Sequence, residues 1–139
     1  MIANKISEKK VNEQQVVIVE AMMTWAKEFS AVSEKNIVAL YAQDASLWGT
    51  FSSLIRTKPD SISDYFEKIF VFEHRKVNFN DYNIRIYGNT AISSGLYTFS
   101  LFKAGQKLVI PARYSFTYVN FQGRWLIVEH HSSVMPEDL

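Results

Sequence analysis

The sequence predicts an α+β domain in which a strongly curved, cone-shaped antiparallel sheet wraps around a long N-terminal helix. Three observations support this fold class. Amphipathic helical patterns occupy the first half of the chain, strand-forming residues fill the second half, and the turns between the later strands are short. Short turns make successive strands antiparallel neighbours, and strands this long require bulges or coiling in the sheet.

The first helix is predicted over residues 12–32. Its apolar side chains recur at helical spacing and form one stripe, while the charged residues lie on other faces. The stripe consists of Val16, Val19, Met22, Met23, Ala26, Phe29 and Ala31. The residues before this helix are polar, so we expect a flexible N-terminus at 1–11 followed by a single domain at 12–139.

Two shorter helices and a short strand are expected next. Ser33 is placed to cap a helix at 34–41, and a strand follows at 46–49. After a polar loop, a third helix is predicted from 58 to about 72, with Asp60 or Ser61 as its cap. Its apolar face is formed by Tyr65, Phe66, Ile69 and Phe70.

The remaining chain is predicted to form four strands, at 77–87, 90–102, 107–121 and 124–134. Aromatic and β-branched residues dominate these segments. Turn-forming residues separate them at 88–89, 103–106 and 122–123, which is typical of a meander of hairpins.

Composition excludes several classes of function. Lys+Arg 15 against Asp+Glu 14 leaves a net charge of +1, so no basic field is available for nucleic acid or an anionic membrane. The absence of cysteine excludes disulfides and thiolate chemistry, and it fits a cytoplasmic location. No apolar run reaches signal-peptide or membrane-spanning length. We predict no cofactor, and no metal, because no three histidines or carboxylates have a workable spacing.

Several short motifs, together with the order of elements, resemble the nuclear transport factor 2-like superfamily. They lie at residues 40–45, 64–66, 88–91, 95–99, 112–116 and 123–137. Within this superfamily the chain is most similar to the association domain of calcium/calmodulin-dependent protein kinase II and its bacterial SgcJ/EcaC-like relatives, with SnoaL-like cyclases as more distant cousins. The likeness implies a cone of curved sheet closed by helices. It implies no kinase activity, since a glycine-rich phosphate loop and an HRD triplet are missing.

The last hairpin contains most of the residues that could perform chemistry. A three-residue loop at 121–123 would pair Arg113 with His131 and Ser115 with Glu129. Their face would then point into the cone. The opposite face would form an aromatic interface between subunits: Tyr114, Phe116, Tyr118, Val128 and His130. A register shifted by one residue would place Arg113 beside His130 and Ser132 instead.

Arg113 is the first candidate for ligand binding. A guanidinium in the middle of a strand needs a carboxylate or another anion, which is either a small organic anion or Glu129 of the same chain. The resemblance implies pocket arginines, and one of them matches Arg113. Another falls near Thr98, where this chain departs from the family. His131 is a candidate general base, as is Glu129, although a lone strand histidine is more often structural.

Four further residues are candidates for the wall of a ligand pocket: Trp48, Tyr65, Tyr97 and Arg56. Core packing or burial at an interface is the competing interpretation for each. His74 is expected to be solvated, and Asp44 is expected to hydrogen-bond within its turn.

Two functions remain open from the sequence. The first is a ligand-binding or homo-oligomerisation domain that forms a dimer or a larger symmetric assembly. The second is an isomerase, cyclase or dehydratase that uses a pocket histidine or glutamate as a base. A third, weaker possibility is an accessory protein that binds a partner through the aromatic face.

Overall fold

The computed structural model describes residues 11–139, so the flexible terminus predicted at 1–11 lies almost wholly outside the described residues. The described elements come in the predicted order, helices first and long strands afterwards. They are α2 (Glu13–Phe29), α3 (Lys35–Val38), β1 (Tyr41–Trp48), β2 (Ile55–Arg56), α4 (Pro59–Ile69), β3 (Glu73–Tyr87), β4 (Thr90–Lys103), β5 (Gln106–Phe121) and β6 (Arg124–Val134). The α+β class predicted from the sequence is confirmed.

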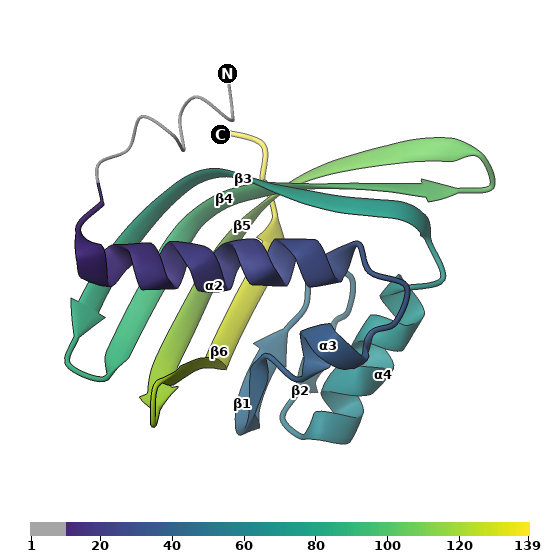
Figure 1. Cartoon of the computed structure of the whole chain (residues 1–139). Helices are drawn as coiled ribbons and strands as arrows, with labels where there is room; N and C mark the ends of the chain where they lie inside the picture. The colour runs from purple at the N-terminus through teal and green to yellow at the C-terminus, as the bar shows by residue number, and fades with distance from the viewer. Residues whose placement is uncertain (1–10) are drawn as a thin grey trace.

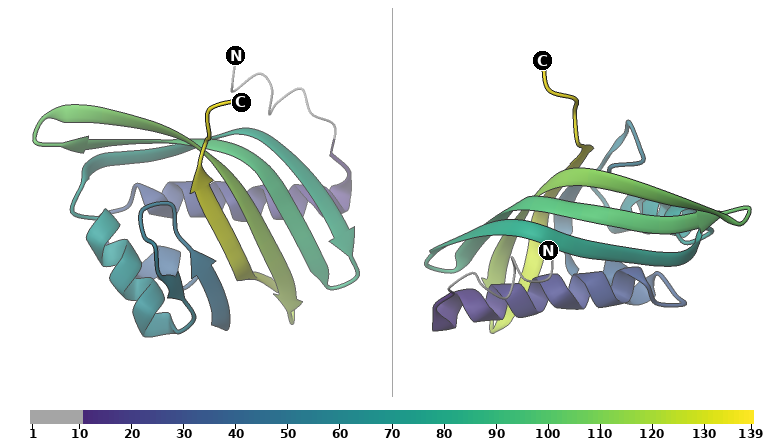
Figure 2. Two further views of the ribbon diagram at one scale, coloured as in Figure 1. Left: turned by 180° about the vertical axis from the view of Figure 1, so that it is seen from behind. Right: turned by 90° about the horizontal axis from the view of Figure 1, so that it is seen from above.

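The six strands form one curved sheet in the order β2-β1-β6-β5-β4-β3. All neighbours are antiparallel except β1 and β6, which run parallel. Helix α2 lies across the concave face of the sheet, and α3 and α4 lie beside β1 and β2 (Figure 1). No helix of the described chain crosses the outer face of β3 to β6 (Figure 2). One face of the sheet is therefore buried, and the other is open.

Helix α2 is fixed at both ends by side-chain hydrogen bonds. Asn12 and Gln15 form a reciprocal capping box at its start. At its end the Arg75 guanidinium donates to the carbonyl of Phe29 at 3.1 Å and to that of Phe72 at 2.6 Å. Arg75 thus binds the last carbonyls of α2 and the segment after α4, which have no helical partners of their own.

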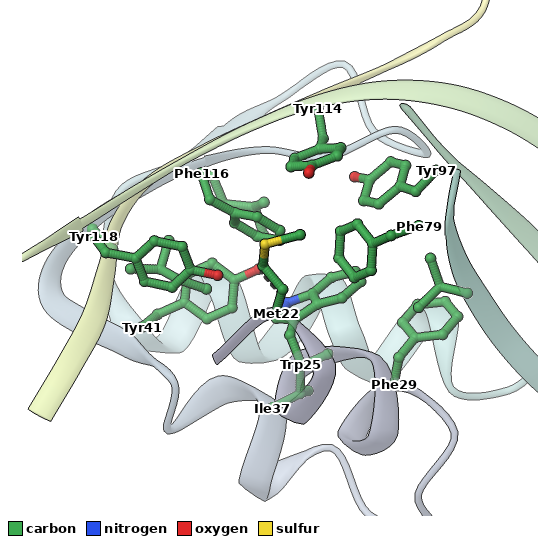
Figure 3. Close-up of a cluster of buried hydrophobic side chains, with 14 of the residues drawn as sticks. Met22, Trp25, Phe29, Ile37, Tyr41, Phe79, Tyr97, Tyr114, Phe116 and Tyr118 are labelled. Atoms are coloured by element: carbon green, nitrogen blue, oxygen red, sulfur yellow. Dashed lines mark hydrogen bonds between the residues drawn. The ribbon is translucent and has the colours of Figure 1, made fainter. Parts of the chain in front are cut away.

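The core consists mainly of aromatic rings from the sheet packed on the buried stripe of α2 (Figure 3). Trp25 lies 5.5 Å from Phe29, 6.0 Å from Tyr97 and 5.5 Å from Phe116, measured between ring centroids. Burial of such large rings supplies much of the hydrophobic stabilisation of a domain of this size.

A bulge in β3 bends the sheet next to Gly95. The register shifts between Phe79 and Asp81, and Gly95 pairs with Tyr82 just beyond this point. A Cβ atom on Gly95 would lie 2.2 Å from the carbonyl oxygen of Asp81. Only glycine allows β3 and β4 to come this close.

Several predicted boundaries are wrong in detail. The second helix is a single turn, α3, and the first strand begins at Tyr41 rather than at 46. Strand β2 lies in the segment predicted to be a polar loop. Neither Asp60 nor Ser61 is the N-cap of α4: that residue is Lys58, whose N–H donates to Ser61 Oγ at 3.1 Å.

Candidate functional site

A two-residue turn connects β5 to β6. Gln122 has φ 53° and Gly123 has φ 93°, and two central residues in the left-handed region are the mark of a type I′ hairpin turn. Phe121 pairs with Arg124 and Asn120 with Trp125. The predicted three-residue loop is therefore wrong.

A single bulge in β6 then decides which side chains face inward. Tyr118 pairs with Ile127, but the next pair is Thr117 with Glu129, so Val128 has no partner. Because side chains alternate between faces, the extra residue moves Glu129 to the outer face. Without the bulge this carboxylate would point into the aromatic core.

The predicted inward position of Arg113 and His131 is wrong. Arg113 pairs with Ser133, and His131 pairs with Ser115, so neither predicted register is found. Both side chains are exposed on the outer face. These polar residues share a face as expected, but it is the face turned away from α2.

The predicted aromatic interface strip is wrong for the same reason. Tyr114, Phe116, Tyr118 and His130 are at most 4% exposed and belong to the core, while Val128 is half-buried at the bulge. The apolar stripe of α2 must be covered by apolar surface, and the large rings of β5 provide it. A face of charged and hydroxyl groups would leave that stripe in contact with polar atoms.

Turning inward, His130 becomes the centre of a buried hydrogen-bonded chain. Its Nδ1 lies 2.8 Å from the Tyr41 hydroxyl, and its Nε2 lies 3.1 Å from the Tyr97 hydroxyl. The Tyr97 hydroxyl donates to Ser132, which is bonded in turn to the Thr50 hydroxyl. The chain thus connects three strands and the loop after β1.

The direction of these bonds assigns the tautomer of His130. Trp25 Nε1, which can only donate, donates to the Tyr41 hydroxyl at 3.1 Å. Tyr41 is then free to donate its own proton to Nδ1 of His130. Tyr97 donates its single hydroxyl proton to Ser132. The bond between Tyr97 and His130 therefore needs the Nε2–H of His130 as its donor. The ring is therefore a neutral Nε2–H imidazole with both nitrogens bonded.

Burial controls the acidity of this cluster. Loss of hydration, with a smaller contribution from His131, lowers the pKa of His130 to about 3. Burial also raises the pKa of Tyr41 and of Tyr97 well above the usual value, so both phenols keep their protons. An imidazole of such low basicity is a weak proton acceptor at neutral pH.

Little space remains beside the network. The inner cavity measures about 10 Å³, which is room for about one water molecule. Phe51 closes it from the loop after β1, with its ring 5.4 Å from Phe99 and its N–H donating to the Tyr65 hydroxyl at 3.3 Å. The interior of the cone is therefore filled by its own side chains.

Arg56, predicted as a pocket residue, is buried at the mouth of the cone. Its guanidinium donates to Asp64 at 2.6 Å, to the carbonyl of Ser61 at 3.1 Å and to Ser52 Oγ at 3.2 Å. The bond from Arg56 is the main reason that the pKa of Asp64 is lowered. An internal carboxylate therefore pairs with this guanidinium, whose Nε is buried without a hydrogen-bond partner.

Trp48 lies away from the other pocket candidates. It is 42% exposed, and its Nε1 donates to Glu129 Oε2 at 3.1 Å. Its ring centroid is 6.0 Å from that of His131. The structure brings Tyr65 and Tyr97 to the small inner cavity, whereas Trp48, Glu129 and His131 gather on the outer face. Ligand contact at these residues stays a prediction.

Three members of the buried chain were not among the predicted site residues: Trp25, Tyr41 and Thr50. Ser132 and His130 were placed on the inner face only by the alternative register, which also put Arg113 there. One signal was available, because Gln122-Gly123 between two strand-like runs favours a two-residue type I′ turn. That turn alone would have paired Phe116 with Glu129. The bulge that brings in His130 leaves no recognisable sequence signal.

Between residues 11 and 139 no three histidine or carboxylate side chains gather as a metal site would require. None of the helices in this part of the chain is long and apolar enough to cross a bilayer.

The outer face of β4 and β5 lies next to these residues and is covered by no described helix (Figure 2). Ser94 pairs with Ser115, and Ser115 pairs with His131, so one row of side chains crosses the open surface. The central positions carry only short or aliphatic side chains that are half-buried: Ile92, Ser94, Leu96, Ser115, Thr117 and Val119. Charged residues of both signs border them: Arg85 and Arg113 are the cations, and Glu129 is the anion.

Comparison with known proteins gives one family match. Residues 13–136 match the sequence model of the calcium/calmodulin dependent protein kinase II association domain. No curated protein matches.

Solved structures with the same fold come from several organisms. A Xanthomonas campestris protein, described provisionally as such an association domain, is 33% identical, with 93% of this chain and 91% of that chain covered and a TM-score of 0.83. The association domain of the C. elegans kinase is 17% identical, with coverages of 86% and 95% and a TM-score of 0.72. A Streptomyces avermitilis protein described provisionally as a dehydratase of the nuclear transport factor 2-like family is 11% identical, with coverages of 86% and 95% and a TM-score of 0.77. The last two likenesses concern the fold alone.

Proposed function

Because the chain belongs to the calcium/calmodulin dependent protein kinase II association domain family, we propose that it is a homo-oligomerisation domain whose copies meet through the outer face of the sheet. The observation that carries this proposal is the composition of that face. Its centre has short and aliphatic side chains, and its border has charges of both signs. A centre poor in charge that is surrounded by a charged rim is common in interfaces between proteins.

A second copy of the chain fits this surface better than an unrelated partner would. In a two-fold contact the same patch meets itself, so the patch must be complementary to itself. The short side chains of Ser94, Ser115 and Thr117 allow a second sheet to approach closely. Arg113 and Glu129 provide opposite charges on a single face, which a two-fold axis can bring together across the contact.

The enzyme alternative has less support from the interior. The candidate bases His131 and Glu129 lie on the outer face, and His130 has both ring nitrogens bonded to buried phenols. A cavity of about 10 Å³ admits no organic substrate in this conformation. General-base catalysis would need a reachable base beside a substrate-sized pocket.

The test is arginine in place of Ser115, at the centre of the proposed contact. We expect S115R to lower the molar mass in solution to that of a single 16.0 kDa chain, because a buried unpaired cation opposes association. The measurement is light scattering or sedimentation equilibrium at micromolar concentration. The wild type should give a multiple of this mass.

The matched control is S53R, an exposed serine in the loop between β1 and β2. It should keep the wild-type mass, and circular dichroism should show that both variants are folded. A monomeric wild type, or an S115R assembly equal to the wild type, would refute the proposed contact.

A further inference from the structure

A hollow outside the cone is formed where β1 separates from β6. Tyr41 pairs with Ile127, but the next pair along the two strands is Ser46 with Glu129. Strand β1 therefore advances five residues while β6 advances two. Residues 42–45 have no partner on β6, and Ala42 and Gln43 line the hollow together with residues of α3 and the start of α4. These elements lie at the same end of the sheet in Figure 1.

This hollow has an apolar floor. Its volume is about 380 Å³, within the range of small-molecule sites. The floor is provided by α3, α4 and β6, through Val38, Ala39, Ile62 and Leu126. Ile62 is 1% exposed, so the floor continues directly into the core.

The polar part of the lining is cationic. Lys35 and Arg124 lie at the hollow with the amide of Gln43, and no aspartate or glutamate is among the lining residues. Neither cation has an ion-pair partner within residues 11–139. A second hollow of about 210 Å³ adjoins the first, shares Arg124 and Leu126 with it, and extends the apolar surface to Trp125.

We propose that this hollow binds a small amphiphilic organic anion, with its apolar body on the floor and its carboxylate or phosphate head between Lys35 and Arg124. Apolar burial would provide affinity, and the two cations would fix the orientation of the ligand. The site is distinct from the inner cavity beside His130 and from the outer face of the sheet. It requires neither Arg113 nor self-association.

The test compares three probes with the same chain length. Octanoate and octyl phosphate carry the anionic head, and 1-octanol lacks it. Titration calorimetry should show saturable 1:1 binding of at least one anion, at least tenfold tighter than octanol. Whichever anion binds more tightly identifies the head group. Binding of an anion should also shift the NMR signals of Leu126 and of the Trp125 indole.

The variants K35Q and R124Q test the role of the cations. Each should weaken anion binding several-fold, and the double variant should reduce it to the octanol level. K107Q, which removes an exposed cation on β5 far from the hollow, should bind like the wild type. Absence of anion binding, equal binding of octanol, or wild-type affinity in the double variant would each overturn the proposal. Because all four lysine and arginine variants keep the centre of the outer face intact, a negative result would leave the oligomerisation test unaffected.

Discussion

Phenylalanine in place of His130 is expected to remove much of the acid sensitivity of this protein. In the folded state the pKa of His130 is lowered to about 3, while an unfolded chain has the ordinary value of 6.5. Between these two values the unfolded state binds a proton that the folded state does not. The contribution of His130 to stability is therefore fully present above pH 6.5 and is lost as the pH falls toward 3.

The expected slope is about 1.4 kcal/mol of unfolding free energy per pH unit within that window. Chemical denaturation of wild type and H130F, at one fixed protein concentration and several pH values, measures it. The difference between the two proteins isolates His130 from the carboxylates, which titrate in both. At neutral pH H130F should be less stable by about 2 kcal/mol, because Tyr41 and Tyr97 each lose a buried partner.

The control for this experiment is H74N, which removes an exposed histidine on β3. Asparagine tolerates the positive φ of 51° at this position. H74N should keep the acid slope of the wild type. If H130F kept that slope as well, the buried neutral imidazole would not be the source of the acid sensitivity.

Alanine in place of Gly95 is expected to destabilise the sheet by about 3 kcal/mol or more. The new methyl group would lie 2.2 Å from the Asp81 carbonyl oxygen and 2.8 Å from Tyr82 Cα. These are backbone atoms of a paired strand, so no rotation of a side chain relieves the overlap. Strand β3 would have to move away from β4 at its bulge. Urea denaturation of G95A, with the slope checked against the wild type, measures the loss.

The control is G105A in the β4–β5 turn. There a Cβ meets nothing within 4 Å, and only the positive φ of 78° opposes alanine. The expected cost is about 1 kcal/mol. Equal stability losses in G95A and G105A would show that the close approach of β3 and β4 is not the deciding factor.

The sequence was sufficient to predict the fold because its long elements have strong periodicity. Helix α2 and strands β4 to β6 lie within a few residues of their predicted positions. Strand β2, with only two residues, carries too little pattern to be recognised. The N-cap of α4 also escaped prediction, because its hydrogen bond uses the backbone N–H of Lys58.

The candidate site was harder to predict. Successive side chains of a strand point to opposite faces of the sheet, and tertiary contacts decide which of the two faces is buried. Arg113 and His131 were grouped correctly on one face, but that face is the outer one. Large rings at Tyr114 and Phe116 are equally suited to a subunit interface and to a core. The position of α2 decides between them. Because Val128 is unpaired, His130 rather than Glu129 points into the core. No local composition rule indicates this change.

Site-specific crosslinking tests the proposed contact between copies most directly. The chain contains no cysteine, so a single cysteine at Ser115 gives each copy one reactive thiol. A short bismaleimide added to S115C should yield a covalent dimer of about 32 kDa on a denaturing gel, twice the 16.0 kDa of one chain. S53C, with its thiol on the loop between β1 and β2, should stay monomeric under the same conditions. Efficient crosslinking of S53C with none of S115C would contradict this account, because it would show that the copies do not associate through the outer face of the sheet.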